Sequence, residues 1–144
     1  MKLCRIGKKE KEKPALIDEE NNYRDLSSII KDLNRNTLNF EILEIIKKTK
    51  IDTLPILDKN ERIGACVSNP PKFIGIGLNF KDHAIEQNLP IPKEPIIFSK
   101  FTNCISGPND NIVVPKNSNH TDWEVELGFV IGKKTKYVSE KDAL

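Results

Sequence analysis

Cysteine is scarce in this 144-residue chain, and its spacing excludes two classes of site. The three cysteines, Cys4, Cys66 and Cys104, lie far apart. They form no CxxC pair of the kind that binds zinc and no even set that would build a disulfide framework. Because disulfides persist mainly in oxidising compartments, the simplest location for such a chain is the reducing cytoplasm.

Long apolar runs and a strong excess of one charge are also missing. No segment is long and apolar enough to span a membrane, and no apolar N-terminal segment indicates secretion. The 23 Lys and Arg residues nearly balance the 21 Asp and Glu residues, which leaves a net charge of +2. This excess is too small and too evenly spread to indicate a nucleic-acid or membrane-surface binder. We therefore expect neither kind of partner.

The first part of the chain has the pattern of a small α+β unit. Residues 1–7 and 13–18 read as strands on either side of a turn with charges of alternating sign. Apolar residues then recur at helical spacing, first at Leu26, Ile29, Ile30 and Leu33. A stronger helix is predicted over residues 37–50, where Leu38, Ile42, Ile45 and Ile46 form one stripe and lysines crowd the C-terminal end.

The composition changes after Pro55, and a boundary is expected within residues 55–72, where turn formers and two adjacent prolines occur. Short apolar segments bounded by Pro and Gly follow, which favours a β-rich second unit. Strands are predicted at 73–80, 95–101, 112–115 and 123–131. We expect an α+β, β-rich fold with a small N-terminal domain (1–61) and a second domain (62–144).

The last residues resemble the first turn of a helix, with Ser139 as its cap and Asp142 three residues later. Few residues of that helix are present. We therefore interpret the chain as the N-terminal portion of something longer, with its second domain truncated at the C-terminus.

Two carboxylates in the stretch "TDWEVEL" (121–127) define the first candidate site. In a strand, residues two apart point to the same face, so Glu124 and Glu126 would lie side by side. Two parallel carboxylates repel each other unless they face water or share a cation. One alternative is a solvated strand face. The other is a divalent cation site, because Mg²⁺ and Ca²⁺ take carboxylate oxygens as ligands.

A second candidate site lies in "IGIGLNFKDHAIEQN" (74–88), where a strand leads into a short helix. Asn79 is expected to cap this helix, with Asp82 three residues later. His83 and Glu86 are then three residues apart on one helical face. A carboxylate beside an imidazole orients the ring and makes it a better general base. The alternative is a plain surface pair, and Lys100 likewise has no spacing that distinguishes it from a surface charge.

Taken together, these stretches resemble the fumarylacetoacetate hydrolase superfamily, in its smaller bacterial-type members. The resemblance is continuous from about Arg62 to Leu144. It is carried by the DHxxE block (82–86), the FxK block (98–100) and the DWExEL block (122–127). Residues 1–61 resemble, less distinctively, the short N-terminal extension of some members.

The resemblance implies a catalytic domain built as a mixed β-sandwich roll, in a protein that is a homodimer in its full-length form. It implies that Glu124 and Glu126 bind Mg²⁺, or a similar ion such as Mn²⁺ or Ca²⁺, together with an aspartate further along the family's sequence. His83 and Glu86 match the pair that activates water on a lid helix. Lys100 matches a lysine near the active site, and Asn79 and Phe80 fall at the substrate, with Phe80 standing where members commonly have Tyr.

The implied activity is metal-dependent hydrolysis of a carbon–carbon bond in a small 2,4-dioxo acid of the fumarylacetoacetate or acylpyruvate type. The same scaffold also supports lyases, isomerases and decarboxylases that act on related 2-oxo acids, including ureidoglycolate lyases. A catalytically incomplete fragment is a further alternative. These alternatives stay open at the level of the sequence.

Overall fold

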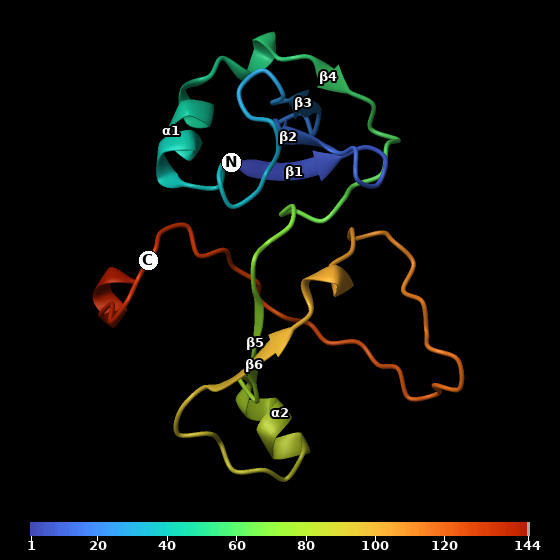
Figure 1. Cartoon of the computed structure of the whole chain (residues 1–144), viewed down its shortest axis with the longest axis vertical. Coiled ribbons are helices and arrows are strands. Elements are labelled where there is room, and N and C mark those ends of the chain that lie inside the picture. Colours follow the sequence, from blue (N-terminus) through green and yellow to red (C-terminus); the bar gives the residue numbers. More distant parts are fainter. Residues whose placement is uncertain (144) are drawn as a thin grey trace.

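The computed structural model describes residues 1–143, and its first strands pair into one antiparallel sheet (Figure 1). The sheet contains β1 (Lys2–Ile6), β2 (Lys13–Ile17), β3 (Tyr23–Asp25) and β4 (Ile56–Leu57) in the order β1-β2-β3-β4. The first two strands, predicted on either side of a charged turn, are confirmed. Gly7 follows β1 with a φ of 128°, a backbone conformation that residues with a side chain rarely adopt.

Helix α1 (Phe40–Lys48) packs against this sheet and closes the hydrophobic core. The predicted helix of residues 37–50 is confirmed but shorter. It begins after Asn39, whose side-chain oxygen accepts a hydrogen bond from the Ile42 amide at 2.9 Å, as expected of an N-cap residue. Ile46 is the buried member of the predicted stripe, whereas Ile45 is 46% exposed. A short 3₁₀ turn, η1 (Ile51–Thr53), follows the helix.

The helix expected around residues 26–33 does not form. The amides of Ile29 and Ile30 both bond to the Leu26 carbonyl, and the chain makes only this single turn. The Asp32 side chain bonds instead to the Leu33 amide and to Arg5, and such local bonds compete with a helix. Leu26, Ile30 and Leu33 are nevertheless buried in the core. The apolar spacing therefore identified the buried residues but not the backbone conformation.

The second part of the chain contains a two-stranded antiparallel sheet of β5 (Phe73–Gly77) and β6 (Ile96–Lys100). Helix α2 (Lys81–Glu86) lies between these strands in the chain. All three elements were predicted. Gly75 pairs with Phe98, and a Cβ added at Gly75 would lie 2.8 Å from Cε2 of the Phe98 ring. The glycine therefore makes room for a neighbouring aromatic side chain.

The strands predicted at 112–115 and 123–131 are absent from the structure. These residues form no backbone ladder with any of residues 1–143, and their side chains are exposed. A strand depends on hydrogen bonds to a neighbouring strand, so an alternating pattern without such a neighbour leaves the backbone irregular. Figure 1 shows this stretch in orange and red as a long irregular trace.

Two short 3₁₀ turns complete the chain, η2 (Thr102–Cys104) and η3 (Glu140–Asp142). Ser139 precedes η3 as predicted, but its hydroxyl donates to the Asp142 carboxylate at 2.6 Å and makes no capping bond to the backbone. Residue 144 of the predicted second domain lies outside the described residues.

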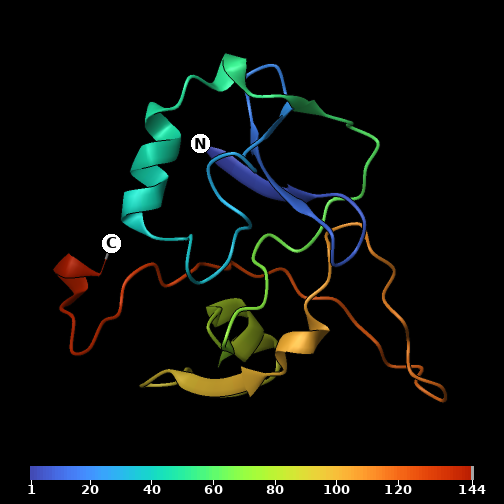
Figure 2. The same cartoon turned by 45° about the horizontal axis from the view of Figure 1, so that its top comes forward.

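Residues 1–143 thus form a small, strand-rich α+β structure with two antiparallel sheets. Figure 2 shows the first sheet and α1 on one side of the molecule, with β5, β6 and α2 on the other. The β-sandwich roll and the domain division at residue 61 stay predictions. None of the helices described between residues 1 and 143 has the length and apolar character needed to cross a membrane.

Candidate functional site

The junction between β5 and α2 carries four of the predicted site residues. The chain leaves β5 at Gly77 and turns at Leu78, whose φ is 48°. Asn79 and Phe80 follow directly, and α2 then carries His83 and Glu86. The structure therefore places these four residues within one strand–turn–helix unit, as the sequence indicated.

His83 and Glu86 form the expected pair on α2. His83 Nδ1 lies 3.6 Å from Glu86 Oε2, which is the distance of an ion pair rather than of a good hydrogen bond. Both side chains are solvent-accessible, with exposed fractions of 46% and 75%. The contact involves Nδ1, so Nε2 is the ring nitrogen that can accept a proton from a water or a substrate.

Asn79 does not cap α2, and that prediction is wrong. The N-cap residue is Phe80, and no side chain makes a capping bond there. Asn79 Nδ2 instead donates to Glu126 Oε2 at 3.4 Å, across 47 residues of sequence. Phe80 is 51% exposed. The contact brings the start of α2 to one of the two predicted metal ligands.

Glu124 and Glu126 lie on the irregular, exposed stretch rather than on a strand. Their side-by-side arrangement on one strand face is therefore not formed. No cluster of three or more acidic, histidine or cysteine side chains suited to a metal ion occurs in the described part of the chain. Two carboxylates two residues apart nevertheless have the donor chemistry that a hard cation prefers.

Lys100 is the last residue of β6 and pairs with Phe73 at the start of β5. Its ammonium lies 5.7 Å from the centroid of the Phe73 ring and 5.8 Å from that of the Phe98 ring. These are distances at which an aromatic face attracts a cation. No hydrogen bond or ion pair described between residues 1 and 143 joins Lys100 to His83.

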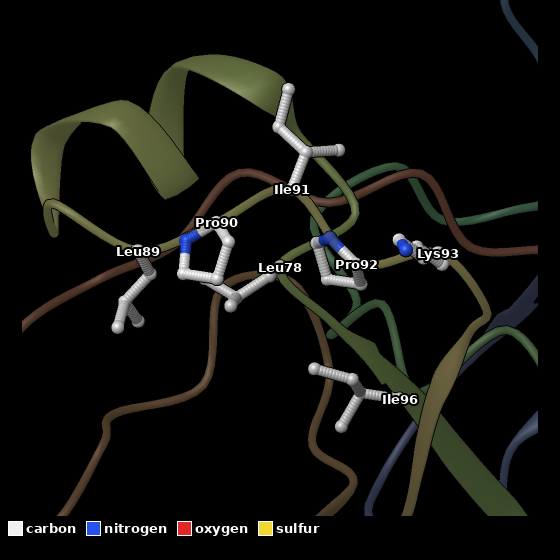
Figure 3. A pocket seen from close by; sticks show the side chains of 7 residues that line it. All are labelled: Leu78, Leu89, Pro90, Ile91, Pro92, Lys93 and Ile96. Atoms are coloured by element: carbon white, nitrogen blue, oxygen red, sulfur yellow. The ribbon is translucent and has the colours of Figure 1, made fainter.

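An apolar hollow beside α2 was not recognised in the sequence (Figure 3). Leu78, directly after β5, and Ile96, the first residue of β6, line it, and the loop after α2 provides the rest. The lining residues are Leu78, Leu89, Pro90, Ile91, Pro92, Lys93 and Ile96. The alternation of proline with Leu89 and Ile91 was the available signal, because prolines hold such a loop extended and leave its aliphatic side chains projecting.

Known proteins resemble this chain along its entire length. A protein of Burkholderia orbicola (strain MC0-3), named only as a hydrolase, is 50% identical over all 144 residues, which cover 51% of that relative. The 2,4-didehydro-3-deoxy-L-rhamnonate hydrolase of Sphingomonas sp. (strain SKA58) is 46% identical over all 144 residues, which cover 49% of it. The chain spans about half the length of the curated relatives it matches.

A family model agrees with these relatives. The model described as fumarylacetoacetate (FAA) hydrolase C-terminal matches residues 72–144, just over half of the chain. The matched region begins directly before β5 and contains the DHxxE, FxK and DWExEL blocks. The chain belongs to the fumarylacetoacetate hydrolase family.

Proposed function

We propose that the protein containing this chain is a divalent-metal-dependent hydrolase that cleaves a carbon–carbon bond in a small 2,4-dioxo acid. The contact between Asn79 and Glu126 is the observation that carries the proposal. It joins the segment of the predicted general base to the segment of the predicted metal ligands, although 47 residues separate the two side chains in sequence.

The chemistry of a named relative supports the substrate class. A 2,4-didehydro-3-deoxy acid has ketone groups at carbons 2 and 4 with a methylene between them, which is the skeleton of a 2,4-dioxo acid. One relative is named as a hydrolase of such a compound. A carbon flanked by two ketones is a good leaving group as an enolate, so water addition to one carbonyl can break the adjacent carbon–carbon bond.

The side chains of α2 would supply the proton transfer. His83, oriented by Glu86 through Nδ1, accepts a proton at Nε2 from a water molecule. The water oxygen bonds to the distal carbonyl carbon, and the carbon–carbon bond then breaks. Its electron pair leaves as the enolate of a 2-oxo acid, which takes up a proton, and a carboxylic acid is the second product. One water is consumed, and no oxidant is needed.

Glu124 and Glu126 would hold the cation through their carboxylate oxygens. Mg²⁺, or Mn²⁺ or Ca²⁺ in its place, would act as a Lewis acid that stabilises negative charge on the substrate oxygens. Asn79 contributes its amide to Glu126, and we place both Asn79 and Phe80 at the substrate. Lys100 adds a positive charge at the end of β6, suited to the carboxylate of a 2-oxo acid.

A hydrolysis assay on the full-length protein tests the proposal. Acylpyruvates with acyl groups of increasing size are the probes, and the assay follows release of a 2-oxo acid with Mg²⁺ and with excess chelator. We expect turnover with the ion and loss of turnover with the chelator. Release of carbon dioxide, or rearrangement without a second product, would contradict hydrolysis and indicate a decarboxylase or an isomerase.

The same proposal includes a homodimer that acts in the cytoplasm. Many large apolar side chains of the family-matched region are exposed, among them Ile97, Trp123 and Leu127. Soluble proteins seldom leave such surface uncovered, which supports burial against further protein in the full-length form. Light scattering during size-exclusion chromatography measures the number of subunits.

A further inference from the structure

A chain of ion pairs links the N-terminal sheet to the loop that follows β6. Arg62 Nη1 donates to Glu12 Oε1 at 2.6 Å. Its Nε and Nη2 donate to the two oxygens of Asp110, each at 2.6 Å. Glu12 also accepts from Arg5 at 3.2 Å, and Arg5 in turn contacts Asp32 at 2.6 Å. Negative and positive side chains alternate along these four ion pairs, so each arginine lies between two carboxylates.

The network is shielded from solvent around Glu12 and Arg5. The Glu12 side chain is 5% exposed and the Arg5 side chain 9%, while Arg62 and Asp110 are about a quarter exposed. The bidentate pairing of the Arg62 guanidinium with the Asp110 carboxylate fixes their relative orientation as well as their distance. The hydrogen bond from Arg62 is the main cause that lowers the pKa of Asp110, to about 2. Burial works to raise the pKa of Glu12, but Arg62 and Arg5 outweigh it and lower that pKa.

Backbone groups make further contacts at the same place. The Gly7 amide donates to the Arg62 carbonyl at 2.8 Å, and the Gly64 amide donates to the Arg5 carbonyl at 2.8 Å. On the other side, the Gly107 amide donates to Asp110 Oδ2 at 2.8 Å. A Cβ added at Gly107 would collide with the Ile63 carbonyl oxygen. Only glycine lets the turn before Asp110 lie this close to the strand edge.

These contacts close a loop of sequence. Residues 62 and 110 are 48 positions apart, and β5, α2 and β6 all lie between them. The chain runs from Arg62 into β5, and after β6 it passes through η2 (Thr102–Cys104) to Asp110. The closed loop therefore contains His83, Glu86 and Lys100.

We infer that Arg62 is a positioning residue, which fastens both ends of the loop 62–110 to the N-terminal sheet and so fixes the placement of α2 and the end of β6. The inference rests on the proposed function for its effect on catalysis, but the attachment of the loop through Arg62 can be measured without any activity. The N-terminal sheet thereby acts on the reaction through Glu12 and Arg62, without touching the substrate.

Two variants remove the fastening by different means. Asp110→Asn removes the negative charge that pairs with Arg62. Gly107→Ala keeps every charge but forces the turn before Asp110 away from the Ile63 carbonyl. Asp18→Asn is the matched control. Asp18 pairs with Arg24 at 2.7 Å and is similarly shielded, but this pair lies within the N-terminal sheet and its loops.

The first measurement is hydrogen exchange in the full-length protein, which requires no activity. We expect the amides of residues 73–77, 81–86 and 96–100 to exchange about tenfold faster in both loop variants, and the amides of β1 and β2 to be unchanged. Asp18→Asn should leave the loop at the wild-type rate. Wild-type exchange of the loop in Asp110→Asn and Gly107→Ala would overturn the inference.

The second measurement separates positioning from simple loss of folded protein. On acylpyruvate substrates, kcat per folded molecule should fall about tenfold in both loop variants while KM changes less than twofold, because misplaced groups slow the chemical step. Arg62→Met combined with Asp110→Asn should be no slower than the slower single variant. Unchanged kcat together with faster exchange would overturn the positioning role. If the wild type shows no hydrolysis at all, the proposed function is wrong. The exchange result then still shows whether Arg62 and Asp110 hold the loop 62–110 to the N-terminal sheet.

Discussion

The side-chain amide of Asn79 donates a hydrogen bond to Glu126 at 3.4 Å. Asn79 precedes α2, and Glu126 lies in the DWExEL block near the end of the chain. The contact uses only Oε2 of Glu126, so the other carboxylate oxygen is available to bind a cation. It joins the turn before the DHxxE block to the DWExEL block.

His83 is expected to carry the proton transfer. His83→Asn in the full-length protein should lower kcat by about 100- to 10,000-fold, the usual contribution of a general base. Mg²⁺ affinity, measured by calorimetric titration, should be unchanged because the cation is assigned to the glutamates.

His120 provides the matched control, since it is the other histidine of the chain and lies outside the DHxxE block. His120→Asn should retain the wild-type rate. A wild-type rate in His83→Asn would remove His83 from the mechanism.

Ile46 is expected to stabilise the N-terminal core. Its side chain is only 1% exposed and packs in a cluster with residues of β2 and of the segments before and after α1. Ile46→Ala should lower the free energy of unfolding by about 2–5 kcal/mol, because it removes buried methyl groups and leaves a cavity.

The neighbouring Ile45 is 46% exposed, so Ile45→Ala should have a much smaller effect in the same denaturant titration. Equal losses in the two variants would mean that α1 packs through a different face.

Asp18 is expected to contribute to stability at moderate pH and to lose this contribution in acid. Burial raises the pKa of the Asp18 carboxyl, but hydrogen bonds from Arg24 and Asn22 outweigh it and lower the pKa from 3.8 to about 2. The unfolded chain therefore binds more protons than the folded chain between these values, so stability falls as the pH drops from about 4 to about 2. The stability of Asp18→Asn should fall less than that of the wild type between about pH 4 and about pH 2.

Acid unfolding followed by circular dichroism checks this expectation. Arg24→Gln serves as the second variant, because it removes the guanidinium that lowers the pKa of Asp18. It should also weaken the dependence of stability on pH. A slope identical to wild type in both variants would show that Asp18 titrates at its ordinary pKa in the folded protein.

Local patterns predicted the elements whose partners are close in sequence. The hairpin of β1 and β2 follows from two strand-like segments around a charged turn, and helix α1 follows from its apolar stripe and its C-terminal lysines. All of these signals act within a few residues. The turn at residues 26–33 was mistaken for a helix because the spacing that buries Leu26, Ile30 and Leu33 is shared by both conformations. A buried single turn and a helix differ in backbone bonds, which periodicity does not report.

The candidate site was predicted only in part for a related reason. His83 and Glu86 meet because their spacing on one helix brings them together. The side-by-side placement of Glu124 and Glu126 depended on a strand, and a strand requires a neighbouring strand, whose position in the sequence no local pattern gives. The contact from Asn79 to Glu126 and the link from Arg62 to Asp110 each span more than 40 residues, so no local pattern indicated either of them.

The proposed hydrolysis depends on a cation held by Glu126. The decisive measurement is kcat of the full-length Glu126→Gln variant on an acylpyruvate, over a range of Mg²⁺ concentrations, beside Glu19→Gln as an exposed control. We expect a loss of about 100-fold or more in Glu126→Gln, which excess Mg²⁺ restores only in part, and a wild-type rate in Glu19→Gln. Undiminished, Mg²⁺-dependent turnover in Glu126→Gln would contradict this role of Glu126.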